Sequence, residues 1–454
     1  MADSTIPAHI FREYDIRGIA EQDIDWRFAY RLGNAFTRLL PPGERRPVVV
    51  GRDVRLTGEA YQQGVIEGIT AAGFDVIDIG MVSTPLAYYA VFTMPSAGCV
   101  MVTASHNPGE YNGFKMMLGQ ESMHGERIGQ LYRLMLAEEV TASTTGTLKR
   151  YDIGTPYHDF VTSDINLQRP LKVVIDAGNG PAGVVAAPLY RALGCEVVEL
   201  YCEPDGSFPN HHPDPTIEAN LFDLQDRVRA TGADLGIAYD GDGDRIGVVD
   251  ESGEIIWGDM LLLLLSRKLL ADNPGATIIS EVKCSQHMYD DIKAHGGSGI
   301  MWRTGHSPIK AKMRETGAKL AGEMSGHIFF ADRFYGFDDA VYAGARVIEM
   351  VAAQPGPFSA MLDGVPKAVT TPEIRVDCPD ARKFALVEEA KAHFSALGYT
   401  IIDIDGMRIK FDDGWGLIRA SNTQPSLVLR FEAPSAARLA EMRKLIEGWL
   451  ESRL

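Results

Sequence analysis

Three aspartates alternate with glycines in the segment YDGDGDR, which contains Asp240, Asp242 and Asp244. Carboxylates this close repel one another, so the arrangement is costly unless a cation balances it. The glycines let the backbone turn tightly, which allows the three side chains to converge. Oxygen ligands select a hard cation, Mg²⁺ above all. The pattern therefore favours a Mg²⁺ site over an acidic hairpin tip, and Arg245 beside it suggests a cation held for a phosphate.

The same segment partly matches an EF-hand loop. Counted from Asp240, the other two aspartates fill positions three and five, and Glu251 falls at position twelve. Position six of that loop requires glycine, but the chain has Arg245 there. The flanking segments are typical of strands rather than helices, so the EF-hand is rejected.

A second pattern, VVIDAGNGPAG, resembles a dinucleotide-binding fingerprint. Gly178, Gly180 and Gly183 follow an apolar run, and Glu199 lies about twenty residues further on. This spacing supports an oxidoreductase as a competing function. However, Pro181 removes an amide from the loop that would hold a pyrophosphate. We prefer a tight turn that packs a helix against a strand.

A third segment, VTASHNPGEYNGFK, places Ser105 directly before His106 and ends at Lys115. A serine hydrolase would need a third orienting group and an oxyanion hole, and no G-x-S-x-G elbow is present. Because the same chain has a predicted Mg²⁺ site, phosphoryl transfer through Ser105 is the better interpretation.

Two further loops contain polar side chains suited to a phosphorylated sugar. In GEMSGHIFF, Glu323, Ser325 and His327 alternate, so they would face the same way in an extended loop. In RASNTQP, a guanidinium lies close to hydroxyls and turn amides, which suits a phosphate. The residues of that loop are Arg419, Ser421, Asn422 and Thr423. The segments WRTGHSPIK and FREYDIRG add His306, Lys310, Tyr14 and Arg17.

The elements that position these loops alternate between helix and strand patterns. PVVVGRDVR, KVVIDAGNG and TIISEVKCS are each an apolar strand that enters a polar turn, which predicts three copies of one α/β architecture. The run MLLLLLSRKLL is too short to span a membrane and predicts a buried helix that starts near Asp259. The end of the chain instead predicts strands with hairpin-like links, flanked by helices near 381–397 and 435–450.

We therefore expect three similar α/β domains with mixed sheets and a C-terminal α+β domain, placed around a central cleft. The predicted ranges are 1–150 with the Ser105 loop, 151–253 with the aspartate loop, 254–365 with the Glu323 loop, and 366–454 with the Arg419 loop.

Composition limits the partners. The 454 residues are 45% hydrophobic and carry a net charge of −17, which argues against a nucleic-acid or anionic-membrane partner. An anionic small molecule needs only a local cluster of cations. Five cysteines without metal-type spacing, and no signal-peptide pattern at the start, predict a cytoplasmic protein with reduced thiols. A monomer is expected, although the sequence does not give the oligomeric state.

Taken together, the motifs identify a family. FREYDIRG, VTASHNPGEYNGFK, DGDGDR, GEMSGH and RASNTQP occur in one order, and the chain resembles the α-D-phosphohexomutases, most closely the bacterial phosphomannomutase/phosphoglucomutase branch. The resemblance implies interconversion of hexose 1-phosphate and hexose 6-phosphate through a phosphoserine and a hexose 1,6-bisphosphate intermediate.

The resemblance also implies residue roles. Ser105 would carry the phosphate, and Mg²⁺ would be held by the phosphoserine and the three aspartates. The loop at Glu323 would bind the sugar, and the loop at Arg419 the phosphate that is not transferred, with Tyr14 among the binding residues. Further residues that would line the reaction centre are Arg17, His106, Lys115, Arg245, Lys283 and His306. The general base stays open between Lys115, His306 and His327.

A phosphoglucosamine mutase is the nearest competing function. Enzymes of that kind typically have Gln at the position of Met324 and the sequence DGDADR, and this chain differs at both points. A non-catalytic sugar-phosphate sensor on the same fold is disfavoured by the intact serine and aspartates. The sequence does not distinguish glucose from mannose.

Overall fold

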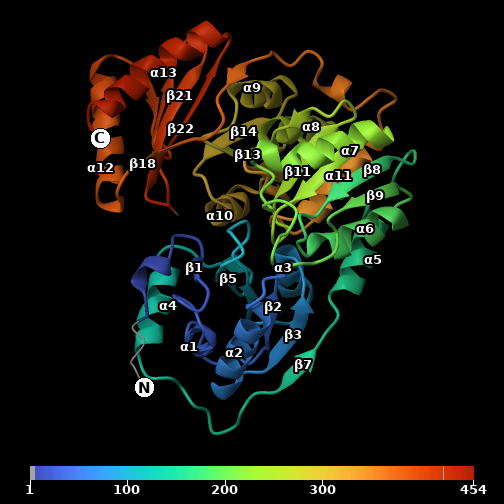
Figure 1. The fold of residues 1–454 in the computed structure, drawn as a ribbon, viewed down its shortest axis with the longest axis vertical. Helices are drawn as coiled ribbons and strands as arrows, with labels where there is room; N and C mark the ends of the chain where they lie inside the picture. The colour runs from blue at the N-terminus through green and yellow to red at the C-terminus, as the bar shows by residue number, and fades with distance from the viewer. Residues whose placement is uncertain (1–5, 423) are drawn as a thin grey trace.

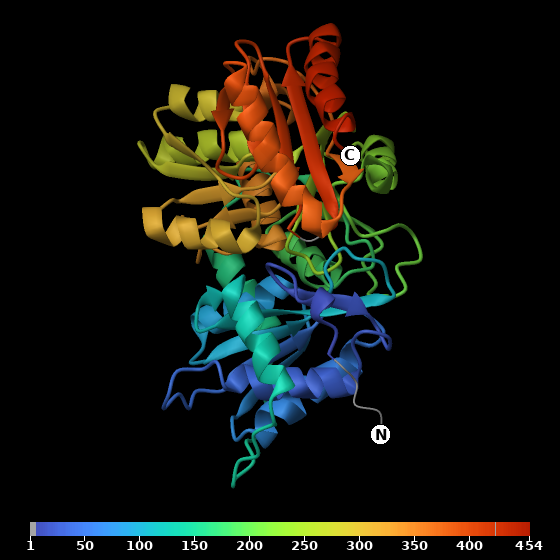
Figure 2. The ribbon, with the colours of Figure 1, turned by 90° about the vertical axis from the view of Figure 1, so that its left-hand side faces the viewer.

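The structure is a computed structural model that describes residues 6–422 and 424–454. It contains four domains, each built on its own β-sheet. In Figure 1 the first domain (blue) lies at the bottom, the second (green) and third (olive to orange) lie at the upper right, and the fourth (red) lies at the upper left. Figure 2, turned by 90°, shows the first domain below the other three.

The first sheet has the order β1-β5-β4-β2-β3-β7, with β6 paired to β5. Strands β2, β3, β4 and β7 are parallel, whereas β5 is antiparallel to β4. Its strands are β1 (Ile16–Ile19), β2 (Val48–Arg52), β3 (Val76–Met81), β4 (Gly98–Val102), β5 (Tyr111–Leu118), β6 (Glu121–Ser122) and β7 (Leu148–Arg150). Its helices are η1 (Ala8–Ile10), α1 (Trp26–Thr37), α2 (Gly58–Ala71), α3 (Thr84–Thr93) and α4 (Glu126–Leu136).

The second and third sheets have the orders β12-β11-β10-β8-β9 and β14-β13-β15-β16. The second domain contains α5 (Gly154–Asp164), β8 (Lys172–Asp176), α6 (Ala182–Ala192), β9 (Glu196–Leu200), η2 (Glu218–Leu221), α7 (Phe222–Thr231), β10 (Leu235–Tyr239), β11 (Ile246–Asp250) and β12 (Ile255–Ile256). The third contains α8 (Gly258–Asp272), β13 (Thr277–Glu281), α9 (Gln286–Ala294), β14 (Ser298–Trp302), α10 (His306–Thr316), β15 (Leu320–Gly322), β16 (Ile328–Phe330), α11 (Ala340–Ala352) and η3 (Ser359–Leu362).

One four-strand unit recurs in these three sheets. In each, the first strand of the unit lies between the second and the third, all three are parallel, and a fourth strand returns antiparallel to the third. The returning strands are β5, β11 and β16. The predicted threefold α/β architecture with mixed sheets is confirmed. Each hairpin before the returning strand contains one of the loops that the sequence analysis selected, because Ser105, Asp240–Asp244 and Glu323–His327 all lie there.

The fourth sheet is antiparallel, with the order β17-β22-β21-β20-β19 and β18 paired to β22. The predicted α+β character of this region is therefore confirmed. Its elements are β17 (Val369–Thr370), β18 (Ile374–Asp377), α12 (Asp380–Ala396), β19 (Thr400–Ile402), β20 (Met407–Lys410), β21 (Trp415–Ala420), β22 (Ser426–Ala433) and α13 (Ala436–Glu451). The RASNTQP loop joins β21 to β22, so it too is a hairpin.

The interior explains the apolar runs. Val48, Val49 and Val50 of β2 are fully buried, as a central parallel strand requires. The leucines 261–265 of α8 are all buried, so the predicted buried helix is confirmed. In the part of the chain that the structure describes, no helix has both the length and the hydropathy to cross a bilayer. Gly183 lies so close to the backbone of Cys202 that a Cβ there would be 2.7 Å away, which agrees with a packing role for the glycine-rich turn.

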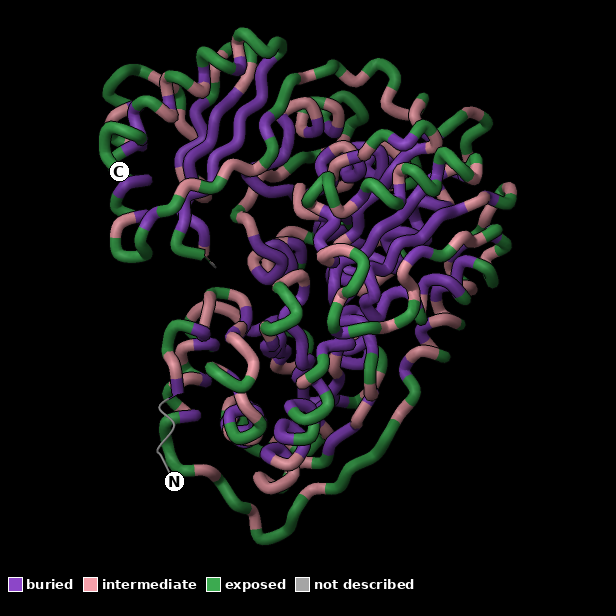
Figure 3. The backbone as a smooth tube through the Cα atoms, in the orientation of Figure 1, coloured by how far each residue is buried: buried purple, intermediate pink, exposed green. Residues whose placement is uncertain are grey.

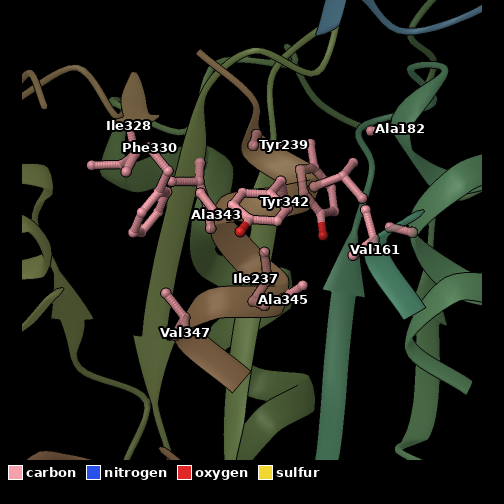
Figure 4. Close-up of a cluster of buried hydrophobic side chains, with 14 of the residues drawn as sticks. Val161, Ala182, Ile237, Tyr239, Ile328, Phe330, Tyr342, Ala343, Ala345 and Val347 are labelled. Carbon is pink, nitrogen blue, oxygen red and sulfur yellow. The ribbon is translucent and has the colours of Figure 1, made fainter. Parts of the chain in front are cut away.

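The first three domains share one hydrophobic core, which contains residues from Val49 to Phe358, and each also has a separate cluster of its own. Figure 3 shows the buried strands at its centre, and Figure 4 shows α11 packed among side chains of the second and third domains, with Phe330 on one side of the view and Val161 on the other. The fourth domain has its own core and meets the third through a small cluster of Val282, Trp415 and Leu417.

A buried carboxylate at the start of α11 gives the stability a pH dependence. Asp339 accepts hydrogen bonds from the Tyr342 amide and the Tyr157 hydroxyl, both at 2.9 Å, and burial raises its pKa to about 7. The unfolded chain loses this proton near pH 4. The contribution of Asp339 to stability therefore falls as pH rises from about 4 to 7.

We expect Asp339→Asn to become more stable relative to the wild type between pH 5 and pH 8, by up to about 3 kcal/mol, because the amide carries no charge to bury. The amide oxygen keeps the bond from the Tyr342 amide. The measurement is the difference in Tm between variant and wild type at the two pH values. A difference that does not change with pH would contradict this account.

Candidate active site

Ser105 lies at the hairpin between β4 and β5 and is 1% exposed. Its backbone has φ of +52°, a left-handed conformation that is uncommon for a residue with a Cβ. Its hydroxyl donates a hydrogen bond to Oδ2 of Asp240 at 2.8 Å and lies 3.1 Å from Nδ1 of His106. The serine of the first domain thus contacts the aspartate loop of the second.

The aspartate loop is held by its own first carboxylate. Oδ1 of Asp240 accepts hydrogen bonds from the amides of Gly243, Asp244 and Arg245 at 3.0 to 3.1 Å. The loop connects the antiparallel strands β10 and β11, which agrees with the rejection of an EF-hand.

The loop has the composition and geometry of a cation site. Asp240, Asp242 and Asp244 are fully buried, and one oxygen from each lies within 4.8 Å of the others. The Oδ1 atoms of Asp242 and Asp244 are buried and accept no hydrogen bond from the described residues. Buried carboxylate oxygens without donors fit a hard cation.

A lysine from the first domain neutralises these carboxylates. Nζ of Lys115, from β5, lies 2.7 Å from Oδ2 of Asp242 and 2.5 Å from Oδ2 of Asp244. Burial alone would raise the pKa of Asp242, but the Lys115 charge outweighs it and holds that pKa well below its usual range. For Asp240, burial and the two neighbouring carboxylates raise the pKa. Burial opposes the charge of Lys115, yet the aspartates raise its pKa, so it stays a cation.

Two arginines lie beside this centre. Arg17 donates through Nη1 to the side chain of Asn107 at 2.6 Å, and Asp15 holds it from the other side at 2.7 Å. Arg245 donates through Nε to Nε2 of His327 at 3.0 Å. Burial, with the charge of Arg245 adding, lowers the pKa of His106 well below its usual value, so the imidazole beside Ser105 is neutral.

The Glu323 loop is a tight turn and not the extended loop that the sequence analysis assumed. The Gly326 amide donates to the Glu323 carbonyl at 3.0 Å, and the Glu323 amide donates to the His327 carbonyl at 2.9 Å. Gly326 has φ of +91°, which permits this turn. As a result Glu323 and His327 are buried while Ser325 is half-buried at the turn, so alternation along an extended chain does not describe the three side chains.

His327 and His306 share a carboxylate that the sequence analysis missed. Oδ2 of Asp338 lies 3.1 Å from Nδ1 of His327 and 3.6 Å from Nδ1 of His306, and Oδ1 accepts from Lys310 at 2.8 Å. Burial lowers the pKa of His306 well below its usual value, and Lys310 lowers it further. The pair Asp338-Asp339 directly before a helix is typical of a helix cap, so only its contacts mark it as part of the site.

The RASNTQP loop contacts the first domain directly and the third domain through Tyr14. Arg419 donates to Asp405 at 3.1 Å, and Asn422 donates to the Tyr14 hydroxyl at 2.9 Å. That hydroxyl donates in turn to the Thr304 carbonyl at 2.8 Å. The Ser421 hydroxyl accepts from the Gln424 amide at 3.1 Å. Thr423, which was also selected from the sequence, lies outside the described residues.

Lys283 lies between the third and fourth domains. Its ammonium is 2.9 Å from Glu373, and it lowers the pKa of that glutamate to about 2. Neither Glu373 nor Asp405 was selected from the sequence, because a lone acidic residue in a strand-and-turn pattern carries no local signal.

The structure thus brings the selected residues into two groups. One surrounds Ser105 and the aspartates and contains Arg17, His106, Lys115, Arg245, His306 and His327. The other contains Tyr14, Lys283, Arg419, Ser421 and Asn422. Glu323 links them, because it accepts a hydrogen bond at 2.7 Å from the amide of Gly305, the residue between Thr304 and His306.

Known proteins resemble the chain over nearly its whole length. Models of phosphoglucomutase/phosphomannomutase alpha/beta/alpha domains I, II and III match residues 8–139, 155–253 and 257–369, and the model of the C-terminal domain matches residues 373–448. A phosphomannomutase/phosphoglucomutase of Pseudomonas putida is 44% identical over 99% of this chain and 97% of the relative. A phosphoglucomutase of Neisseria gonorrhoeae is also 44% identical, over 99% and 98% of the two chains.

A solved structure agrees. The crystal structure of a phosphoglucomutase/phosphomannomutase family protein from Burkholderia thailandensis has a TM-score of 0.90 and 45% identity, and the match covers 97% of this chain and 96% of that one. These matches favour the predicted phosphohexomutase over a phosphoglucosamine mutase, a sensor or an oxidoreductase. The chain belongs to the phosphoglucomutase/phosphomannomutase family of phosphohexomutases.

Proposed function

We propose that the enzyme interconverts hexose 1-phosphate and hexose 6-phosphate of glucose and mannose by carrying a phosphate on Ser105. The observation that carries this proposal is the 2.8 Å hydrogen bond between the Ser105 hydroxyl and Asp240, at the edge of three buried aspartates. A serine placed there is next to the positive charges that a phosphate needs, since Lys115 lies between the other two aspartates.

The reaction would proceed in two transfers. A sugar hydroxyl attacks the phosphorus on Ser105, the bond from phosphorus to the serine oxygen breaks, and a hexose 1,6-bisphosphate forms. The bisphosphate turns over, and its other phosphate returns to Ser105 as the product leaves. Phosphoryl transfer depends chiefly on positioning and charge neutralisation. Arg17, Lys115 and Arg245 supply positive charge on the side of Ser105.

Asp240, Asp242 and Asp244, with the phosphate on Ser105, would hold a Mg²⁺ ion. When bound, this ion neutralises charge on the transferred phosphoryl group.

A general base must take the proton of the attacking hydroxyl. Of the three candidates, Lys115 is held as a cation by two carboxylates, whereas His306 is neutral. His306 and His327 are both oriented by Asp338. We therefore place the base at the histidine pair rather than at Lys115.

The remaining site residues would bind the sugar and the second phosphate. Glu323 and Ser325 offer hydrogen bonds to sugar hydroxyls, and Lys283 and Arg419 are buried cations suited to a phosphate. Ser421, Asn422 and Thr423 would complete the phosphate loop, with Tyr14 closing it from the first domain. The preferred hexose stays open, and a cytoplasmic location and a monomeric state remain predictions.

Ser105→Ala tests the phosphate carrier. Active enzyme should contain a phosphate mass increment on the peptide with Ser105, and the variant should lose nearly all conversion of glucose 1-phosphate while its fold persists by circular dichroism. Ser163→Ala, at an exposed position on α5, is the matched control and should behave as the wild type. Full turnover in Ser105→Ala would end the proposal.

The metal site is tested with Asp242→Asn. This variant removes one of three charges, so we expect weaker Mg²⁺ binding by calorimetry and slower turnover that excess Mg²⁺ partly restores. Asp226→Asn, on the exposed face of α7, serves as control. EDTA should inhibit the wild type reversibly, and activity that survives complete metal removal would refute the metal's role.

The fourth domain is expected to close over the substrate. It has its own core, and it meets the first domain through the Asn422–Tyr14 hydrogen bond and a partly exposed Arg12–Asp380 ion pair at 3.8 Å. A largely solvated ion pair and a single hydrogen bond each contribute little, so these two contacts can open. A small domain of this kind is suited to a hinge motion.

Arg419→Ala should therefore raise KM ten- to a hundred-fold, because a lost charge-assisted hydrogen bond weakens binding by roughly 1.5–3 kcal/mol. It should also lower kcat, because the loop positions the substrate as well as binding it. Small-angle scattering should show that a non-reactive sugar bisphosphate compacts the wild type more than this variant. Arg438→Ala, at a partly exposed position on α13, is the control. Identical curves for free and liganded wild type would leave the loop as a static phosphate site.

A further inference from the structure

One buried arginine binds the backbone of the Ser105 loop along its whole length. Arg55 follows β2 and is 1% exposed. Its Nη2 donates to the carbonyls of Ser105 at 2.8 Å and Asn107 at 2.5 Å, and its Nη1 donates to the carbonyls of Pro108 and Tyr111, both at 2.7 Å. Four main-chain acceptors between the end of β4 and the start of β5 thus converge on one guanidinium.

Arg55 is itself held from behind. Oδ1 of Asp53 accepts the Arg55 amide at 2.9 Å, and Oδ2 lies 3.3 Å from Nε, with both side chains fully buried. The Asp53 amide donates to the Val102 carbonyl at 3.0 Å, which fixes this turn to the end of β4. From the second domain, the Phe208 ring lies with its centroid 5.5 Å from Cζ. The guanidinium is therefore held on three sides.

The bond from Arg55 to the Ser105 carbonyl matters because Ser105 has a positive φ. A residue with a Cβ keeps a positive φ only where several contacts hold its backbone in that conformation. At Ser105 the carbonyl is bound by Arg55, and the amide donates to the Thr103 hydroxyl at 2.9 Å. Gly241 of the aspartate loop packs directly on the same carbonyl, where a side chain would collide. Loss of the arginine would free the peptide that aims the serine oxygen at Asp240.

We propose that Arg55 is a positioning residue for phosphoryl transfer, which holds Ser105 in its left-handed conformation so that its oxygen meets the aspartate loop. This inference rests on the proposed role of Ser105. Arg55 touches only the backbone of the loop, so it acts on the transfer step through geometry and leaves substrate binding to the other domains. A planar guanidinium can serve four carbonyls and a carboxylate at once, whereas a lysine ammonium has three donors at one point.

Arg55→Lys tests the inference because it keeps the positive charge but loses the planar guanidinium that binds four carbonyls at once. We expect kcat for glucose 1-phosphate to fall about 100-fold, the effect of a displacement near 1 Å, while KM stays within about threefold. The phosphorus NMR signal of the phosphorylated enzyme should broaden or shift. Arg133→Lys, at an exposed position on α4 of the same domain, should leave all three readouts unchanged.

A purely structural role for Arg55 predicts a lower Tm with wild-type kcat and an unchanged phosphorus signal in the folded fraction, and that result would overturn the inference. If Arg55→Lys does not fold, Asp53→Asn decides, since it keeps the acceptor for the Arg55 amide but removes the carboxylate charge that holds the guanidinium from behind. A kcat loss at constant KM supports positioning, and wild-type kcat refutes it. An active Ser105→Ala would instead refute the phosphoserine itself, so the two failures are distinguishable.

Discussion

Three carboxylates that are fully buried within 4.8 Å of one another repel, and much of the molecule is arranged around the charges that balance them. Lys115 lies between two of them, Ser105 donates to the third, and the amides of their own loop donate to Asp240 as well. Both Lys115 and Ser105 come from a different domain than the aspartates. Groups of the first domain therefore stabilise the buried carboxylates of the second domain. These contacts hold the two domains together at the place where the chemistry occurs.

The three α/β domains use one solution to place their functional loops. In each, the third parallel strand ends, turns, and returns as an antiparallel strand paired beside it. Loops at the carboxyl ends of parallel strands are the usual place for ligands in such sheets. Each of these loops is also a short hairpin connection between two paired strands. Ser105, the aspartates and Glu323 are therefore held by a strand on both sides. The fourth domain also presents a hairpin, between β21 and β22, although its sheet is antiparallel throughout.

What the sequence could predict was local. Apolar runs such as Val48–Val50 and leucines 261–265 indicated buried elements, and short motifs indicated the loops that carry serine, carboxylates and arginine. Contacts between distant segments could not be predicted in this way. Nothing in the residues around Asp338 indicates that two histidines share it, and nothing in GRDVR indicates that its second arginine reaches a loop about fifty residues away. The Glu323 loop was mistaken for an extended segment because alternation of polar residues was given more weight than the turn that Gly326 permits.

The shared interior of the first three domains constrains how the chain can be made. Its core draws on residues from Val49 to Phe358, so it is not complete until the ribosome has synthesised most of the protein. The first domain has a separate core, with residues from Ile6 to Met135, that is complete early, but apolar side chains of the second domain must wait for α11. The last domain has its own core and follows the rest out of the exit tunnel. Nascent chains of this enzyme therefore expose apolar surface of the second domain until α11 has been synthesised, whereas the first and fourth domains each have a core of their own.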